Sequence, residues 1–362
     1  MQFYKLMVCS NVHGSHKMKV KKRSFGTLSS GKKVSLFTVT NGEMSFSVTN
    51  LGCAITSILL PSSNGIPVDV VLGYSTLDGY ALNGPYLGCL VGRFANRVSG
   101  AAFEVAGQTW SLDSNDHGNC LHGGRPGYHK TVWDAEVFAN SREAGVIFRR
   151  RSPAGEQGFP GNLDMKVVYA LTAANDIVLR YSAKTDQPTH VNLTNHTYFN
   201  LAGHDSGSVL NHEVQLFADR YTPVDQNAIP SGEILDVAGT PFDFRAGKKI
   251  GFDIDKVPGG FDHNWEINRA GDPLNPVALV ADPVSGRKLT VESTQPGVQF
   301  YTGNFLSGEI GKLGARYEKN AGFCLETQHF PDTPNRPEFP PSILLPGDRY
   351  RQETVWHFDF EQ

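Results

Sequence analysis

Apolar and polar residues alternate along much of the chain from Val34 onward. The segment Met44-Ser45-Phe46-Ser47-Val48-Thr49 is the clearest case, and a period of two is typical of a strand with one buried and one solvated face. Further segments rich in β-branched and aromatic residues predict strands at residues 145–148, 165–171, 177–181, 288–291 and 298–301. Clusters of Gly, Pro, Asn and Asp, as at 155–161 and 272–276, predict the turns between strands.

The chain contains no internal repeat, no low-complexity linker and no helical period longer than about three turns. Many short strands with frequent turns predict an all-β fold, one large antiparallel β-sandwich, with a single domain over residues 24–362. Residues 1–23 differ from the rest because they end in the basic cluster KMKVKKR. We expect this N-terminal segment to form a poorly ordered, solvated arm.

Charge and cysteine content narrow the classes of function. Lys and Arg total 33 against 36 Asp and Glu, a formal net charge of -3, so no global basic field favours nucleic acid or anionic membranes. No segment approaches the roughly 18 uninterrupted apolar residues of a membrane span, and the N-terminus shows no signal-peptide core. The five cysteines include no C-x-x-C pair, which is typical of reduced thiols. We therefore expect a cytoplasmic protein with neither nucleic-acid nor membrane partners.

Two cofactor motifs are incomplete. Residues 26–32 (GTLSSGK) follow most of the P-loop spacing, but Lys33 stands where a Ser or Thr would bind magnesium. No H-E-x-x-H helix occurs, and His190, His196 and His204 do not have the spacing of a zinc set. The sequence predicts no cofactor and no metal.

Six segments place hydrogen-bonding side chains within otherwise apolar or Gly-rich stretches. Amides and carboxylates can hydrogen-bond to adjacent hydroxyls, Arg supplies a fixed fork of donors, and aromatic faces cover the C–H patches of a sugar. This inventory favours a neutral polyol as the ligand. The segments are GRFANR (92–97), NCLHGG (119–124), VNLTNHTYFNLAG (191–203), GFDHNW (260–265), VQFY (298–301) and LETQ (325–328).

These segments closely resemble the aldose 1-epimerase, or galactose mutarotase, family. The motifs GRFANRV, LHGG, VNLTNHTYFNLAG, PSGEILDVAGTPFDFR, FDHNW, VQFYTGNF and LETQHFPD occur in the family's order, and the resemblance covers roughly residues 24–360. It implies the family's fold, a galactose mutarotase-like supersandwich with the sugar in a groove on one face. It also implies an isomerase that interconverts the α and β anomers of free aldohexoses such as galactose and glucose.

The resemblance assigns roles residue by residue. Glu326 of LETQ corresponds to the general base, His196 of NHTYFNL to the general acid, and His122 of LHGG to a second active-site histidine near the ring oxygen. The residues that correspond to ligands of the sugar hydroxyls are Asn96, Arg97, Asp262 and Gln299.

Interconversion of anomers requires both an acid and a base. The base removes the proton of the C1 hydroxyl while the acid protonates the ring oxygen, so the C1–O5 bond breaks, and rotation about C1–C2 with reclosure completes the cycle. A carboxylate with an ordinary pKa of about 4.3 is ionised at neutral pH, and an imidazole near 6.5 can be held protonated by neighbouring carboxylates. This reasoning predicts an ionised Glu326 beside a protonated His196.

Other conspicuous residues have structural interpretations. One of Arg93 and Arg97 is expected to make only a structural pair, and the family pattern favours Arg97 as the sugar ligand. We expect Tyr198-Phe199 to pack in the core and Gly123-Gly124 to form a tight turn beside the LHGG histidine. Trp265 fits either the core or the site. His204, His212, His329 and His357 are predicted to be ordinary core or surface residues.

Alternatives remain at this point. The chain could be a carbohydrate-binding or sensing protein without turnover, although both members of the acid–base pair are present. A mutarotase for a hexose 6-phosphate would need clustered cations near C6, where Asp262 would repel a phosphate. An isomerase of another cyclic hemiacetal would use the same ring opening. We expect a small sugar as the partner and a monomer or weak homodimer.

Overall fold

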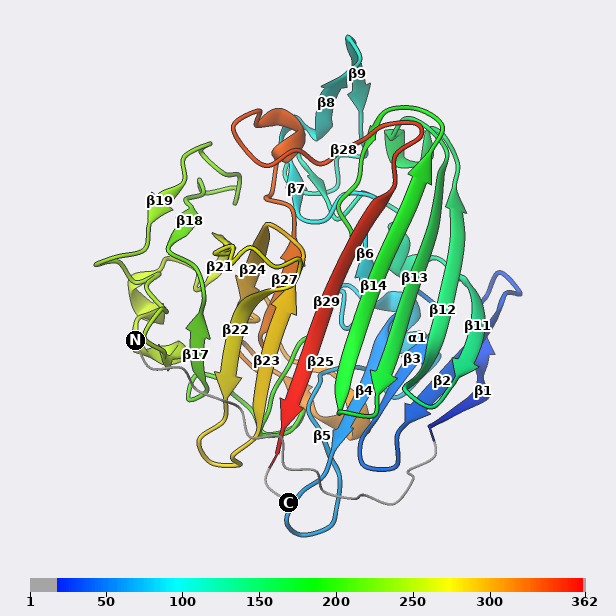
Figure 1. Ribbon diagram of the computed structural model, residues 1–362, viewed down its shortest axis with the longest axis vertical. Helices are drawn as coiled ribbons and strands as arrows, with labels where there is room; N and C mark the ends of the chain where they lie inside the picture. The colour runs from blue at the N-terminus through cyan, green and yellow to red at the C-terminus, as the bar shows by residue number, and fades with distance from the viewer. Residues whose placement is uncertain (1–17, 361–362) are drawn as a thin grey trace.

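A nine-stranded antiparallel sheet forms one layer of the computed structural model, which describes residues 18–360 (Figure 1). On its long strands apolar side chains turn inward, and most side chains of the outer face are polar. In spatial order, its strands are β11 (Asp134–Ala139), β12 (Glu143–Ser152), β13 (Leu163–Thr172), β14 (Asp176–Thr185), β29 (Tyr350–Asp359), β23 (Lys288–Ser293), β22 (Asn275–Ala281), β17 (Glu213–Leu216) and β20 (Lys248–Lys249).

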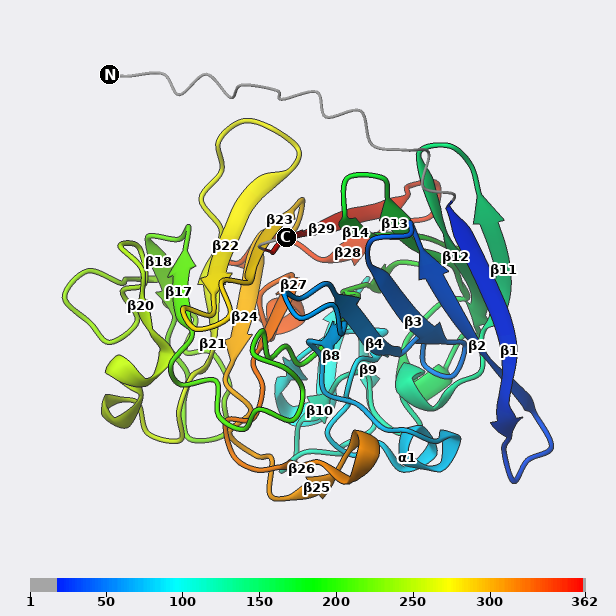
Figure 2. The same ribbon diagram turned by 90° about the horizontal axis from the view of Figure 1, so that it is seen from below.

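Two five-stranded sheets lie behind this layer (Figures 1 and 2). The first consists of β1 (Lys19–Thr27), β2 (Lys33–Thr40), β3 (Ser45–Thr49), β4 (Ile55–Leu60) and β5 (Val68–Asp69). The second, in the order β19 (Leu235–Asp236), β18 (Arg220–Thr222), β21 (Asp262–Glu266), β24 (Gly297–Tyr301) and β27 (Cys324–Gln328), carries much of the site described below.

Short two-stranded ladders connect these sheets. They pair β6 (Leu90–Val91) with β16 (Thr194–Asn195), β7 (Arg97–Val98) with β10 (Cys120–Leu121), β8 (Ala102–Val105) with β9 (Gln108–Ser111), β15 (Thr189–His190) with β28 (Ile343–Leu344), and β25 (Glu309–Ile310) with β26 (Arg316–Tyr317). Within the described residues the one α-helix is α1 (Leu77–Leu82). No helix there has the length and apolar content needed to cross a bilayer.

One continuous apolar core holds the three sheets together. It joins Phe46 of the first five-stranded sheet, Tyr169 of the nine-stranded sheet and Phe300 of the second five-stranded sheet in one cluster of contacting side chains. Every ladder between named strands is antiparallel. The predicted all-β antiparallel sandwich is therefore confirmed, and the strands predicted at 145–148, 165–171, 177–181, 288–291 and 298–301 lie within β12, β13, β14, β23 and β24.

The N-terminal boundary differs from the prediction. Residues 1–17 of the expected arm lie outside the described residues, but Lys19–Thr27 forms β1 and pairs with β2 from Lys19 onward. The cations of this edge strand are exposed, while Val20 and Phe25 are partly buried, so a basic cluster that resembles a tail pairs with the sheet instead. The segment with P-loop-like spacing is the turn of this hairpin, closed by a hydrogen bond from Leu28 N–H to Lys32 O. All four cysteines within the described residues are buried and unpaired.

Candidate active site

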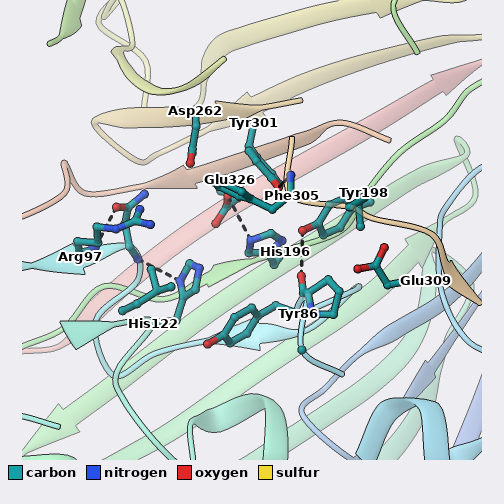
Figure 3. Close-up of a pocket in the computed structure, with 15 residues that line it drawn as sticks. Tyr86, Arg97, His122, His196, Tyr198, Asp262, Tyr301, Phe305, Glu309 and Glu326 are labelled. Carbon is teal, nitrogen blue, oxygen red and sulfur yellow. Dashed lines mark hydrogen bonds and ion pairs between the residues drawn. The ribbon is translucent and has the colours of Figure 1, made fainter. Parts of the chain in front are cut away.

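A cavity of about 350 Å³ opens where β21, β24 and β27 meet the loops around β7, β10 and β16 (Figure 3). Its volume is at the lower end of the roughly 300–1,000 Å³ that small-molecule sites usually have. Six of the seven residues assigned by resemblance line it: Asn96, Arg97, His122, His196, Asp262 and Glu326. Residues more than 200 positions apart in the sequence thus meet in one pocket.

The alternation of side chains along the strands orients the acidic residues of the site toward the cavity. Glu326 and Cys324 lie two residues apart on β27, so their side chains share a face. Tyr301 pairs with Asp262 on one side and with Cys324 on the other, which aligns the three strands. Because the intervening Leu325 enters the apolar core, the register of β27 fixes Glu326 toward the cavity.

Tight turns orient the side chains on the opposite side of the cavity. Asn96 and His122 have φ values of 61° and 50°, in the left-handed region that side chains other than Gly seldom adopt. Gly123 follows at φ 81°, and a Cβ there would lie 2.1 Å from the carbonyl oxygen of Gly92. Only glycine fits this approach, so the tight turn predicted beside His122 is confirmed.

The Glu326 carboxylate and the His196 imidazole face each other at the floor of the cavity. Oε1 and Nε2 are 3.7 Å apart, with the side chains only 3% and 6% exposed. Glu326 Oε2 is buried without a hydrogen-bond partner within residues 18–360. A buried carboxylate oxygen left unpaired costs free energy, which indicates an oxygen that a ligand would engage.

In both His196 and His122 the ring nitrogen Nδ1 contacts a neighbouring group. His196 Nδ1 lies 3.6 Å from Cys324 Sγ, and the Asn96 N–H donates to His122 Nδ1 at 3.2 Å. Burial lowers the pKa of His122 well below its usual value, so the ring is neutral. Since Nδ1 accepts a hydrogen bond, the proton of His122 is on Nε2, which can donate to a ligand oxygen.

Burial shifts the acid–base pair away from the charges predicted from the sequence. It raises the pKa of Glu326 well above its ordinary value, with a further increase from Asp262, and it lowers the pKa of His196 to about 4. Because burial moves the two pKa values in these directions, a proton shared by the pair favours the carboxyl group over the imidazole, which differs from the predicted ionised Glu326 and protonated His196. The sequence argument used ordinary pKa values and could not include the desolvation of both groups.

Arg97 and Gln299 are each paired with a carboxylate. Arg97 Nε donates to Asp116 Oδ2 at 2.7 Å while the guanidinium lines the cavity. Gln299 Nε2 donates to Asp262 Oδ1 at 2.7 Å, but Gln299 does not line the cavity. Gln299 stands directly opposite Glu326 in the ladder between β24 and β27, and its amide orients the Asp262 carboxylate.

His122, His196 and Glu326 also form a cluster whose ligand atoms lie within 4.8 Å of one another. The sequence spacing gave no hint of it, because the three residues belong to separate elements. A metal would need an unprotonated nitrogen from each imidazole. In His122 the Asn96 N–H occupies Nδ1 and the proton occupies Nε2, so this donor set fits a ligand oxygen better than a cation.

The sequence reasoning missed several cavity residues. Tyr198, predicted as core, stacks on His196 with centroids 5.1 Å apart and also lines the cavity. Tyr86 packs 4.7 Å from His122, and Phe305, 74% exposed, stacks on Tyr301 at the rim. Glu309 adds a carboxylate to the wall. Tyr301 and Phe305 lie within the VQFYTGNF motif, which was a usable signal.

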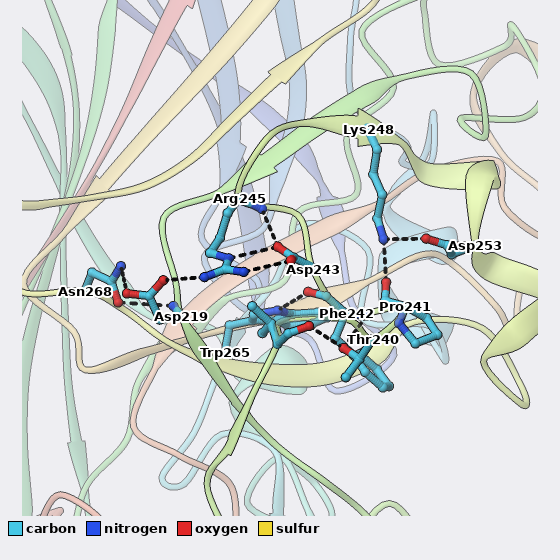
Figure 4. Close-up of polar contacts among 11 residues, drawn as sticks. Asp219, Thr240, Pro241, Phe242, Asp243, Arg245, Lys248, Asp253, Trp265 and Asn268 are labelled. Carbon is cyan, nitrogen blue, oxygen red and sulfur yellow. Dashed lines mark hydrogen bonds and ion pairs between the residues drawn. The ribbon is translucent and has the colours of Figure 1, made fainter.

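Several other residues have structural roles. Arg93 is buried and donates to backbone carbonyls, at 2.7 Å to that of Pro160. Trp265 is buried, and its Nε1 donates to the carbonyl of Phe242 (Figure 4). In the same region Arg245 bridges two aspartates, so the PSGEILDVAGTPFDFR segment braces the second five-stranded sheet.

Comparison with known proteins gives consistent matches. A model of the family described as aldose 1-epimerase matches residues 35–357. Galactose mutarotase of Mus musculus is 44% identical over 337 residues, covering 92% of this chain and 97% of that protein. Aldose 1-epimerase of Escherichia coli K12 is 37% identical over 325 residues, covering 88% and 93%.

Solved structures of proteins similar to this chain have the same fold. The crystal structure of galactose 1-epimerase from Lactobacillus acidophilus NCFM has a TM-score of 0.84 at 28% identity, covering 95% of this chain and 100% of that chain. The structure of an aldose epimerase homologue from C. elegans has a TM-score of 0.81 at 28% identity, covering 88% and 96%.

Proposed function

This chain belongs to the aldose 1-epimerase family, and from that premise we propose that Glu326 and His196 are the base and acid with which it interconverts sugar anomers. The protein is an isomerase, related over most of its length to galactose mutarotases and aldose 1-epimerases. We propose galactose as its principal substrate and glucose as a second one.

One observation carries the assignment of the pair: Glu326 Oε1 and His196 Nε2 are 3.7 Å apart, buried, and open to the same cavity. In a cyclic sugar the C1 hydroxyl and the ring oxygen are bonded to the same carbon, so the groups that exchange protons with them must be close neighbours. The unpaired Oε2 of Glu326 provides a free acceptor for the C1 hydroxyl.

The reaction then follows from these positions. Sugar hydroxyls replace the missing hydration and stabilise the charged forms, so a proton moves from Glu326 to His196 within the complex. Glu326 accepts the C1 hydroxyl proton as His196 protonates O5, and the ring opens to the aldehyde. After rotation about C1–C2, His196 takes back the O5 proton and Glu326 returns its own. Positioned acid and base groups each supply about 10²- to 10⁴-fold.

The other pocket residues hold the sugar in this proposal. His122 donates from Nε2 toward the ring oxygen, while Asn96, Arg97 and Asp262 take hydroxyls and Gln299 orients Asp262. The aromatic rings of Tyr86 and Phe305 offer apolar surfaces for the C–H faces of the sugar.

The pocket also favours a neutral sugar over a phosphorylated one. Three carboxylates, those of Asp262, Glu309 and Glu326, face one guanidinium, and Arg97 is already neutralised by Asp116 at 2.7 Å. A phosphate would meet repulsion without a free cation. Location in the cytoplasm and a monomeric or weakly dimeric state remain proposals from the sequence.

Two isosteric variants test the mechanism. Glu326→Gln and His196→Asn should each slow the relaxation of freshly dissolved α-D-galactose, followed by polarimetry, by about 10²- to 10⁴-fold. Glu353→Gln, on the outer face of the nine-stranded sheet, is the matched control and should retain wild-type activity. Full activity in either pocket variant, with an unchanged melting curve, would remove the assigned roles.

A further inference from the structure

A hollow on the outer face of the nine-stranded sheet carries more cations than carboxylates. We name it the basic hollow and define it by Lys166 on β13, Ser182 and Lys184 on β14, Arg349 directly before β29 and Arg351 on β29. Its two carboxylates, Asp164 and Glu353, are already in ion pairs with Arg151 and Arg180. Strands β13, β14 and β29 lie side by side at the front of Figure 1. None of these residues lines the sugar cavity, which lies between β21, β24 and β27 and the loops around β7, β10 and β16.

Strand alternation turns all these side chains outward. Their neighbours Met165, Ala183 and Tyr350 are buried in the core, so the residues between them face solvent. Lys166 pairs with Ser182, and Ser182 pairs with Arg351 across the next ladder. The Ser182 hydroxyl therefore lies between two cations whose strands are about 9.5 Å apart, which is two strand spacings.

Several other cations of this sheet are paired with carboxylates. Arg149 pairs with Glu136 at 2.9 Å, Arg180 is held by Glu143 and Glu353, and His357 lies between Asp176 and Glu292. By contrast, the side chains of Lys166, Lys184, Arg349 and Arg351 form no ion pair and donate no hydrogen bond to any residue in the range 18–360. The Ser182 hydroxyl makes only a long hydrogen bond, of 3.5 Å, to the carbonyl of Lys166.

Cations without a carboxylate partner destabilise the surface that carries them. Like charges gathered on neighbouring strands repel one another and weaken the sheet. In a protein with a formal net charge of -3, an unneutralised group of four cations indicates a place for an anion from outside the chain. Arg, Lys and Ser hydroxyl are the side chains that bind phosphoryl oxygens.

We propose that the basic hollow binds the oligophosphate group of a small molecule. The hollow consists of two adjoining depressions of about 320 Å³ and about 200 Å³, which share Lys166, Ser182 and Arg349. Two joined depressions with shared cations fit two linked phosphoryl groups better than one. The ligand chemistry is thus a pyrophosphate group, free or as part of a nucleoside diphosphate.

Calorimetric titration with inorganic pyrophosphate and, separately, with adenosine diphosphate tests the proposal. Saturable binding of one pyrophosphate per chain is expected, and Arg349→Gln with Arg351→Gln should weaken it at least about tenfold. Arg149→Gln with Lys288→Gln removes the same charge from exposed positions of the same sheet and should change affinity less than about twofold. Tighter binding of the nucleotide would identify it as the source of the group.

Several results would overturn the proposal. No saturable binding, equal weakening by both double variants, or displacement of pyrophosphate by galactose would each do so, and so would tighter competing binding by a polyglutamate peptide. Amide NMR shifts of the unmodified protein provide a second measurement that needs no variant. Pyrophosphate should perturb amides around Ser182, and perturbation centred on His196 instead would refute the site.

Discussion

Replacing Asp262 by Asn should shift the alkaline limb of the pH–rate profile toward acid. The carboxylate of Asp262 raises the pKa of Glu326, in addition to the effect of burial. The acid–base pair needs one proton, whether it resides on Glu326 or on His196. Removing a nearby negative charge lowers the pH at which that proton is lost.

The magnitude follows from the sheet. Asp262 on β21 and Glu326 on β27 lie two strands apart, with β24 between them, and they are offset by two residues, because Asp262 pairs with Tyr301 and Glu326 with Gln299. Two strand spacings across and two residues along correspond to about 12 Å. Two unit charges at that separation with an effective dielectric constant of 20 interact by about 1.4 kcal/mol. This equals about 1 pKa unit. The limb should therefore move by about one pH unit.

The assay is the initial rate of α-D-galactose mutarotation across pH, with the uncatalysed rate subtracted at each point. Asn keeps the shape of Asp and can still accept the hydrogen bond from Gln299 Nε2, so the position of the limb separates charge from sugar affinity. Asp236→Asn, at an exposed site, is the control. An alkaline limb that stays in place, or moves to higher pH, would refute the electrostatic argument.

Three further predictions concern stability. Gly123→Ala should lower the free energy of unfolding by at least about 3 kcal/mol in calorimetry, because φ is 81° there and the new Cβ would lie 2.1 Å from a backbone oxygen. The control Gly100→Ala has a φ of 60° but open space around the new Cβ, so it should lower the free energy of unfolding by only about 1 kcal/mol. His357, whose pKa is raised to about 9 by hydrogen bonds to two carboxylates, should stabilise the fold fully below about pH 6.5 and lose that contribution as pH rises through 9. With 35% of the side chain exposed, we expect about 1 kcal/mol, measured as the pH-dependent difference in urea unfolding from His357→Gln; a pH-independent difference would contradict the linkage. Lys312→Met should lower the free energy of unfolding by about 3–5 kcal/mol, because it leaves the Asp69 carboxylate, 2.6 Å from Lys312 Nζ, without its cation. Adding Asp69→Asn should recover part of that loss, and a double variant less stable than the single one would contradict this.

The sequence by itself determined the strands and their faces. In the first half of β13 and the second half of β14, buried side chains alternate with exposed or partly exposed ones, and this period is a local property that does not depend on the strand's partners. The resemblance of the motifs around Glu326, His196 and His122 to the aldose 1-epimerase family also pointed to the proposed acid–base residues, and the structure brings all three side chains to one cavity. The basic residues of β1 show the limit of sequence-based prediction, because an edge strand rich in lysine and a solvated tail have the same composition.

Only the tertiary structure decided which side chains share the cavity and in what charge state. Tyr86 reaches the pocket from a loop and Glu309 from β25, and no local pattern connects either residue to Glu326. Gln299 is bonded to Asp262 and does not line the cavity. The pKa values of Glu326 and His196 depend on how much protein excludes water around them. Desolvation and long-range packing are set by segments hundreds of residues apart, so a local reading of the chain cannot supply them.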